Sequence, residues 1–283
     1  MSNGNLVLFI GAGASIASGM PSWNYAVGQI AKRLGIAANP QDILKIPQYY
    51  YNQRGKKEYT SLMRELFRYK EALKPGDIHD LILKFNVDTI ITTNYDNLIE
   101  LAAEKNNSFI YPISNDKELP YKHGKELIKM HGDFEHDNFV LREDDYLNYD
   151  RNFKLIRNYI TSLIGTKTVL FIGYGFNDPD IKQIFSWLKD ALHDDFQRAY
   201  MISVDDYDEN VADYFKNFGI NVLYSRKITG IESSEDKSSL LTETLEWILA
   251  DDEIDLLDSL YYELRPFGYL NKPFINYITP IVK

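Results

Sequence analysis

The fold is decided by the stretch LVLFIGAGASIASGMPSW, which covers residues 6–23. It opens with a continuous apolar run that ends at a glycine, which is typical of a strand buried on both faces of a parallel sheet. Gly11 and Gly13 begin the dinucleotide-binding pattern G-x-G-x-x-G, but Ile16 stands where the third glycine would fall. Helical spacing of apolar residues starts only at about Ser22. The stretch therefore predicts a strand, a long glycine loop and a helix.

Strand and helix patterns alternate along the rest of the chain. Residues 40–86 lack the alternation of a strand and are predicted to form two or three helices, whereas residues 106–125 are predicted to be a long connection. This order predicts an α/β fold with a doubly wound, mostly parallel Rossmann-like sheet and a helical insertion at about residues 40–86. Further strands are predicted at residues 87–93, 127–130, 168–172, 199–204 and 220–224, and further helices at about 96–104, 180–192 and 238–249.

The chain is predicted to consist of one nucleotide-binding domain and a tail. The domain covers residues 1–250. Residues 251–283 are expected to hold a C-terminal helix and an aromatic stretch without periodicity. Because exposed aromatic residues favour packing, we expect this tail to contact the domain, a second copy of the chain or a partner.

Composition excludes several classes of function. The 283 residues include no cysteine, and the five histidines lack a metal-binding spacing, so neither a disulfide nor a zinc or other metal site is expected. A net charge of −10 argues against direct binding of nucleic acid. The basic residues of the segment 53–74 alternate with glutamates at helical spacing, which indicates a solvated helix face. Apolar runs are far shorter than the roughly 20 residues of a membrane span, and no signal peptide is recognised, so a cytoplasmic protein without membrane contact is expected.

Three polar or glycine-rich clusters directly follow predicted strands. They are GAGAS at residues 11–15, TTNYD at residues 92–96 and MHGD at residues 130–133. Ligands of such sheets bind outside the carboxyl ends of the strands, so we expect the clusters to meet at one crevice. Gly11 and Gly13 would let the backbone approach a pyrophosphate. The alternative is a tight turn that binds nothing.

Asn94, Asp96 and His131 carry the candidate chemistry. An asparagine can hold a ribose hydroxyl or orient a water, and a carboxylate can bind an amide or offset a developing positive charge. Taken alone, Asn94 or Asp96 would more usually cap the helix that follows. His131 at a strand end can serve as a general base near neutral pH, or it can be a structural histidine with satisfied hydrogen bonds. His79, near the start of a helix, is expected to be structural.

The motifs taken together resemble the sirtuin family. The order GAGAS, SGMP, TTNYD, an HG pair and a G-x-G-F turn covers about residues 6–205. The stretches TTNYD and KMHGD, with the turn at residues 176–179, are similar to the sirtuin-like NAD-hydrolysing domains of bacterial anti-phage defence, as in Thoeris effectors. Deacetylating sirtuins carry a cysteine-ligated zinc module, which a chain without cysteine lacks. The resemblance implies NAD as a substrate, with no lasting cofactor and no zinc.

The resemblance also implies roles for individual residues. Asn94 would hold the ribose or the attacking water, His131 would act as the base on the ribose hydroxyls, and Asp96 would lie near the nicotinamide carboxamide. The other residues expected to bind NAD are Gly11, Ala12, Gly13 and Ser15 at the pyrophosphate, Gly173, Gly175 and Phe176 at the adenosine half, and Pro21, Trp23, Thr93 and Ser203.

The activity implied is that of an NAD glycohydrolase, which releases nicotinamide and ADP-ribose and depletes NAD during phage infection. Because such an activity is toxic, it is expected to be switched on by assembly as a homo-oligomer or by a partner. Two alternatives use the same crevice. One is a non-catalytic nucleotide-binding module that assembles with a HerA-type motor ATPase or another defence partner, and the other is an ADP-ribosyltransferase.

Overall fold

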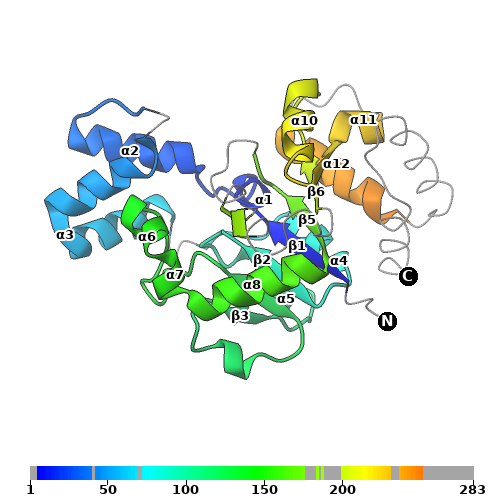
Figure 1. Ribbon diagram of the computed structural model, residues 1–283, viewed down its shortest axis with the longest axis horizontal. Helices are drawn as coiled ribbons and strands as arrows, with labels where there is room; N and C mark the ends of the chain where they lie inside the picture. Colours follow the sequence, from blue (N-terminus) through cyan, green and yellow to red (C-terminus); the bar gives the residue numbers. More distant parts are fainter. Residues whose placement is uncertain are drawn as a thin grey trace.

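The computed structural model describes residues 5–39, 42–68, 72–175, 183–184, 186–187, 199–230 and 236–250. Its strands form one parallel sheet of seven strands in the order β3-β4-β2-β1-β5-β6-β7 (Figure 1). The predicted doubly wound parallel sheet is thus confirmed. The strands are β1 (Leu6–Ile10), β2 (Thr89–Thr92), β3 (Tyr111–Ile113), β4 (Glu126–Lys129), β5 (Thr168–Ile172), β6 (Ala199–Ser203) and β7 (Ile220–Tyr224).

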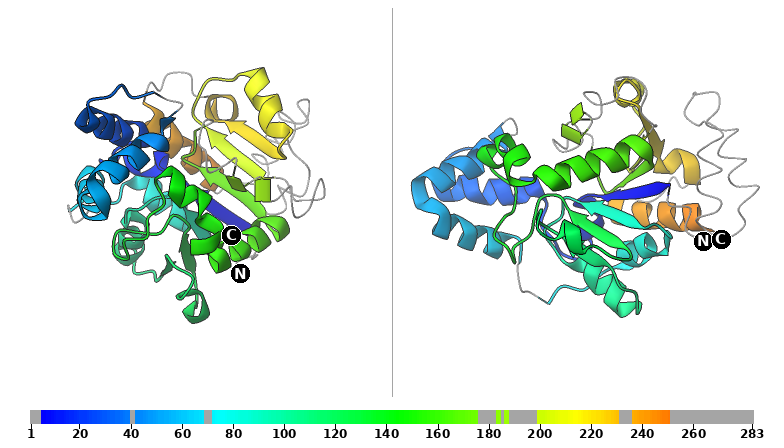
Figure 2. Two further views of the ribbon diagram at one scale, coloured as in Figure 1. Left: turned by 60° about the vertical axis from the view of Figure 1, so that its left-hand side comes forward. Right: turned by 60° about the horizontal axis from the view of Figure 1, so that its bottom comes forward.

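Helices cover both faces of the sheet. Helices α4, α5 and α12 lie on one face, where α4 contacts both of the others, and α8 lies on the opposite face (Figure 2). The helices are α1 (Gly13–Ile16), α2 (Trp23–Leu34), α3 (Lys45–Leu66), α4 (Asp77–Lys84), α5 (Leu98–Lys105), α6 (Glu143–Leu147), α7 (Tyr149–Asn152), α8 (Lys154–Thr166), α10 (Glu209–Lys216), α11 (Ser225–Thr229) and α12 (Lys237–Leu249), with a 3-10 turn at Leu119–Tyr121.

Strand β1 lies at the centre of the sheet because its residues are apolar on both faces. All five of its side chains are buried, and it pairs in parallel with β2 and β5. In this register Ile10 lies beside both Thr92 and Ile172, so the three strands end at the same level. Burial of a continuous apolar run on both faces is the expected behaviour of a central parallel strand.

A second hydrophobic cluster joins α2 and α3 to the end of the sheet. Its buried members include Ile30 of α2, Met63 of α3 and Tyr95, which follows β2. Tyr95 also donates a hydrogen bond from its hydroxyl to the carbonyl of Val140. Helix α4, in contrast, buries Ile82 in the core of the sheet. The helices of residues 40–86 are therefore divided between two clusters, and α2 and α3 project to one side of the sheet (Figure 1).

The structure adds elements that the sequence patterns did not predict. The glycine loop contains the short helix α1, and the predicted connection at residues 106–125 contains the edge strand β3. Two short helices, α6 and α7, and the longer helix α8 occupy residues 143–166. A strand of three residues with Pro112 at its centre is too short to give a periodic signal. Most of the helix predicted at residues 180–192, and the whole tail at residues 251–283, lie outside the described residues.

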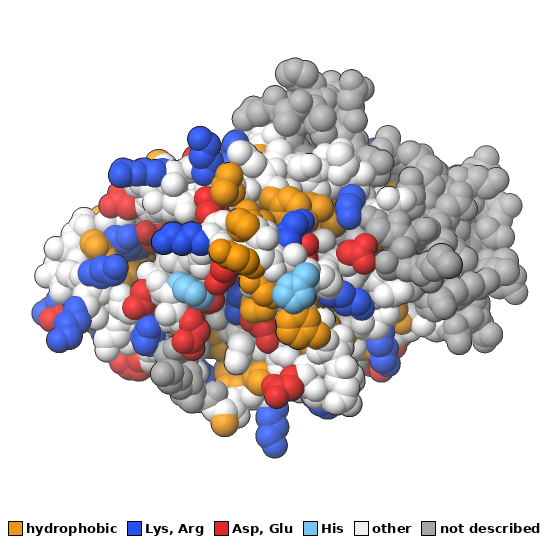
Figure 3. Space-filling model, turned by 90° about the horizontal axis from the view of Figure 1, so that it is seen from below, with side chains coloured by type: hydrophobic (Ala, Val, Ile, Leu, Met, Phe, Trp, Pro, Cys, Tyr) orange, Lys and Arg blue, Asp and Glu red, His pale blue; other side chains and the backbone are white. Residues whose placement is uncertain are grey.

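Two observations concern the outside of the molecule. Within the described ranges, no helix combines the length and the apolar character that crossing a bilayer requires. On the face seen in Figure 3, basic and acidic side chains are interspersed.

Glycines let the loops after β1 and β5 touch backbone to backbone. Gly13 donates its N–H to the carbonyl of Gly173 at 2.8 Å, and Gly173 has a φ of 75°, a conformation that favours glycine. A Cβ on Gly13 would lie 2.7 Å from Gly173 O, and a Cβ on Gly11 would lie 2.8 Å from the same atom. These glycines are therefore required by packing, whether or not a ligand binds.

We expect Gly13→Ala to lower the free energy of unfolding by about 1–3 kcal/mol, as overpacking does. The matched control is Gly28→Ala within α2, where an added Cβ meets nothing within 4 Å. Because alanine favours a helix, the control should raise stability by up to about 1 kcal/mol. Urea unfolding monitored by circular dichroism measures both. Equal unfolding midpoints for the two variants would contradict the packing requirement.

Candidate functional site

The predicted clusters lie at the ends of adjacent strands. Strands β4, β2, β1 and β5 are neighbours in the sheet, and their last residues are level: Thr92 pairs with both Ile10 and Lys129, and Ile10 pairs with Ile172. The segments that begin at Gly11, Thr93, Met130 and Gly173 therefore leave the sheet side by side. This is the edge at which parallel α/β sheets bind ligands.

Asn94 links the first two clusters. Its side chain is buried, and its Nδ2 donates to the carbonyl of Gly11 and to Ser15 Oγ, both at 3.2 Å. Because a backbone carbonyl can only accept, the contact with Gly11 fixes which end of the amide is the nitrogen. Both hydrogens of Nδ2 are thus used, and Oδ1 is the end of the side chain left to accept a hydrogen bond from a ligand.

His79 is joined to the same cluster through Ser15. The ring is 1% exposed, its Nδ1 accepts from the N–H of Gly76 at 3.2 Å, and its Nε2 lies 3.4 Å from Ser15 Oγ. Burial lowers the pKa of His79 and favours the neutral ring, which then carries its hydrogen on Nε2. Ser15 Oγ therefore faces two donors, so its own hydroxyl hydrogen is available to a ligand. The sequence did not predict this contact because 64 positions separate His79 from Ser15.

His131 is held in an aromatic setting beside the end of β4. Its ring is 2% exposed and lies edge-on to Tyr146 and Tyr149, at centroid distances of 5.6 Å and 6.3 Å. Tyr149 donates its hydroxyl to the carbonyl of Met130 at 2.7 Å, which fixes this wall against the strand. The imidazole thus follows the strand next to that of Asn94, and its role as a base stays a prediction.

The side chain of Asp96 binds the backbone at the start of α5. This is the structural contact expected as the alternative to a contact with a ligand. Its Oδ1 accepts from the N–H of Leu98 at 3.1 Å, at the start of α5. Its carbonyl accepts from Lys129 Nζ at 2.8 Å, and this buried lysine also pairs with Glu100 at 2.8 Å. These contacts fix the turn between β2 and α5. The predicted place of Asp96 near the nicotinamide is not tested by them.

Hydrogen bonds within the glycine loop limit which of its groups could bind a pyrophosphate. The N–H groups of Gly11, Gly13, Ala14 and Ser15 donate to backbone carbonyls at 2.8–3.1 Å. Two side-chain donors, Ser18 Oγ and Trp23 Nε1, are buried and have no hydrogen-bond partner in the described part of the chain. Polar contacts of this loop with a ligand would therefore come mainly from side chains.

The remaining predicted residues are spread along the same edge. Thr93 Oγ1 shares a hydrogen bond with the hydroxyl of Tyr174 at 3.0 Å. Ser203 ends β6, the strand beside β5, and its Oγ accepts from the N–H of Asp205 at 3.2 Å. Ala12 and Gly175 are exposed, Pro21 is partly buried, and Phe176 lies outside the described residues. Among the residues that the structure describes, no three or more histidine, aspartate or glutamate side chains form a group that could hold a metal ion.

The burial of His79 predicts a pH dependence of stability. Its pKa is lower in the folded than in the unfolded protein, so the unfolded chain takes up the proton first when the pH falls below about 6.5. The stabilisation is therefore present above this pH and is lost as the pH falls. Between pH 7 and pH 5 the free energy of unfolding should decline more steeply in the wild type than in His79→Gln, by up to about 1.4 kcal/mol per pH unit.

Urea unfolding at each pH measures this difference between the two proteins. The matched control is His123→Gln, which replaces an exposed histidine and should keep the slope of the wild type. Parallel pH profiles for the wild type and His79→Gln would refute the assignment.

Comparison with known proteins places these features in a family. Residues 88–223 match the model of the SIR2-like domain. Defense-associated sirtuin 2 of Bacillus subtilis is 33% identical over 284 residues, which cover 93% of this chain and 28% of that protein. The NAD(+) hydrolase ThsA of Bacillus cereus is 33% identical over 208 residues, which cover 70% of this chain and 43% of that protein.

The chain thus spans between about a quarter and a half of the length of these two relatives. A solved structure of a Sir2 enzyme aligns with 86% of this chain and 91% of its own, at 11% identity and a TM-score of 0.48. The family match and the two relatives agree with the order of motifs along the sequence. The chain therefore carries a SIR2-like domain and is homologous to defence-associated sirtuin 2 and ThsA.

Proposed function

We propose that this protein is an NAD glycohydrolase that cleaves NAD to nicotinamide and ADP-ribose. The observation that carries the proposal is the cluster of Ser15 and Asn94, which are hydrogen-bonded to each other where β1 and β2 end. Each residue keeps one hydrogen-bonding group for a ligand: the hydroxyl hydrogen of Ser15 and Oδ1 of Asn94. The name of ThsA, an NAD(+) hydrolase, supports NAD as the substrate.

The reaction breaks the bond between C1′ of the ribose and the nicotinamide nitrogen. The electron pair of that bond leaves with nicotinamide, and positive charge develops on the ribose. The oxygen of a water then bonds to C1′, and one of its protons passes to a base. A protein speeds such a reaction mainly by positioning the reactants and by stabilising the developing charge.

The residues of the cluster fit these steps. Asn94 Oδ1 would accept a hydrogen bond from a ribose hydroxyl or from the attacking water. His131 would take the proton, since a neutral imidazole is a suitable base at neutral pH. The buried donors Ser18 Oγ and Trp23 Nε1 would bind oxygens of NAD and so gain the partners that the described residues do not give them.

The biological setting is part of the same proposal. The name of defence-associated sirtuin 2 supports a role in defence, in which depletion of NAD would stop phage growth. We infer that assembly as a homo-oligomer, or contact with a partner such as a HerA-type ATPase, switches the activity on. Transfer of ADP-ribose to another acceptor would use the same residues and would differ only in its product.

Asn94→Ala should lower the rate of nicotinamide release by about 100-fold or more, which is typical of the loss of one polar group at a developing charge. Mass spectrometry of NAD incubated with purified protein measures both nicotinamide and free ADP-ribose. Ser15→Ala should reduce the rate as well. His123→Ala, which changes an exposed histidine, should leave it unchanged.

The assays include the protein alone, at high concentration and with a co-expressed partner. Absence of nicotinamide release by the wild type in every one of these states would contradict the proposal. Nicotinamide without an equal amount of free ADP-ribose would indicate transfer to an acceptor in place of hydrolysis.

A further inference from the structure

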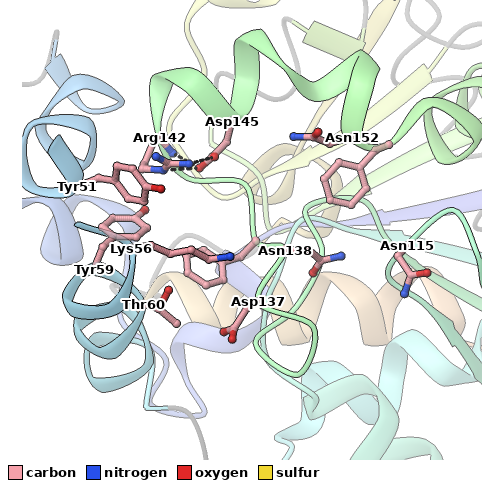
Figure 4. A pocket seen from close by; sticks show the side chains of 12 residues that line it. Tyr51, Lys56, Tyr59, Thr60, Asn115, Asp137, Asn138, Arg142, Asp145 and Asn152 are labelled. Atoms are coloured by element: carbon pink, nitrogen blue, oxygen red, sulfur yellow. Dashed lines mark hydrogen bonds and ion pairs between the residues drawn. The ribbon is translucent and has the colours of Figure 1, made fainter. Parts of the chain in front are cut away.

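A cavity lies between α3 and the segments that follow β3 and β4 (Figure 4). Its volume is about 330 Å³, at the lower end of the range of ligand pockets. Tyr51, Lys56 and Tyr59 line it from α3, Asn115 from the turn after β3, and Asn152 from α7. Because segments after β3 and β4 form its walls, the cavity opens on the carboxyl edge of the same sheet.

Three acceptor side chains of this cavity already bind groups of the protein. Asp145 binds Arg142 through both of its carboxylate oxygens, with Nε at 3.1 Å from Oδ2. Asp137 pairs with Arg64 at 2.8 Å. Asn138 Oδ1 accepts from a backbone N–H at 3.0 Å. These three side chains therefore use part of their hydrogen-bonding capacity within the protein.

The donor groups, in contrast, are unused. Tyr59 is only 2% exposed, and its hydroxyl is buried. This hydroxyl nevertheless has no hydrogen-bond partner in the described part of the chain. Burial raises the pKa of Tyr59 well above its usual value, so the hydroxyl keeps its hydrogen. Within the same residues, neither the ammonium group of Lys56 nor the amide hydrogens of Asn115 and Asn152 have a hydrogen-bond acceptor.

Aromatic surface and a positive charge complete the lining. The guanidinium of Arg142 lies 3.7 Å from the ring centre of Tyr51, and Asp145 balances its charge. Lys56 is therefore the basic group of the cavity without a counter-ion in the described chain. Figure 4 shows the side chains of Tyr51 and Tyr59 together at one end of the cavity and Asn115 and Asn152 at the other.

We propose that this cavity binds a small phosphate ester of a sugar, of the size of a sugar phosphate or a mononucleotide. A phosphate group brings negative charge and several acceptor oxygens, which suit an excess of donors and an unpaired lysine. The phosphate would accept hydrogen bonds from the Tyr59 hydroxyl and from Lys56, and the sugar would pack against the faces of the aromatic rings. The site is separate from the Ser15 and Asn94 cluster, since neither residue lines the cavity.

Isothermal titration calorimetry on the full chain tests the proposal, with ribose 5-phosphate, AMP and inorganic phosphate as probes and ribose as the uncharged control. Tyr59→Phe and Lys56→Met should each weaken binding of the two esters about ten-fold, the effect of losing one charge-assisted hydrogen bond. The matched controls are Tyr49→Phe and Lys57→Met, which change exposed neighbours on α3 that do not line the cavity. Both controls should keep the affinity of the wild type.

Tyr59→Phe also distinguishes a loss of binding from a loss of folding. Because the hydroxyl makes no bond within the described chain, its removal should leave the thermal midpoint of the free protein unchanged or raise it. The absence of binding by both esters, unchanged affinity in either test variant, or equal affinity for inorganic phosphate would overturn the proposal. Binding of NAD in place of the esters would do so too, since the cavity would then belong to the substrate site. The readout needs no turnover, so it is independent of NAD cleavage.

Discussion

The contact between the backbones of Gly13 and Gly173 sets the geometry on which the candidate site depends. It holds the loop after β1 against the loop after β5, and no side chain can be placed between them without a clash. On the other side of β1, Thr92 Oγ1 donates to the carbonyl of Ile10 at 2.9 Å and accepts from the N–H of Asn94 at 3.0 Å. The glycine loop is therefore fixed from both neighbouring strands. These contacts place Ser15 within hydrogen-bond distance of Asn94.

The polar groups of the site are arranged around neutral partners rather than ion pairs. Ser15 Oγ lies between the amide of Asn94 and the ring of His79, and the lowered pKa of that ring keeps positive charge away from the loop. Charge is placed farther out, where Lys129 pairs with Glu100 and also binds the carbonyl of Asp96. A neutral, buried surrounding strengthens hydrogen bonds to any charge that develops in it. This arrangement suits a reaction in which the substrate itself supplies the charge.

The molecule has two hydrophobic clusters, and both candidate sites adjoin the cluster of α2 and α3. Tyr95 stands between Asn94 and Asp96 in the chain but packs into the cluster of α2 and α3, within 5.4 Å of the ring of Phe134. Tyr95 therefore connects the cluster of α2 and α3 to the segment after β2 that contains Asn94. The cavity lined by Tyr59 lies against the other end of that cluster. There the ring of Tyr59 stacks on that of Phe139, with 5.9 Å between the ring centroids. Both sites thus depend on how α3 is held against the sheet.

The sequence by itself determined the sheet and the edge at which the site lies. Runs such as Leu6–Ile10 and Thr168–Ile172 are apolar on both faces, and burial on both faces of a parallel sheet is the arrangement that hides them fully from water. Ser22, where the helical spacing begins in the sequence, is the N-cap of α2, because capping depends on local chemistry alone. Strand β3 was not predicted because an edge strand of three residues is too short to show a hydrophobic period. Tertiary structure alone decided which partners Ser15 and Tyr59 meet. A hydrogen bond across 64 positions, or a hydroxyl buried without a partner among the described residues, depends on packing between distant segments, and no local pattern records it.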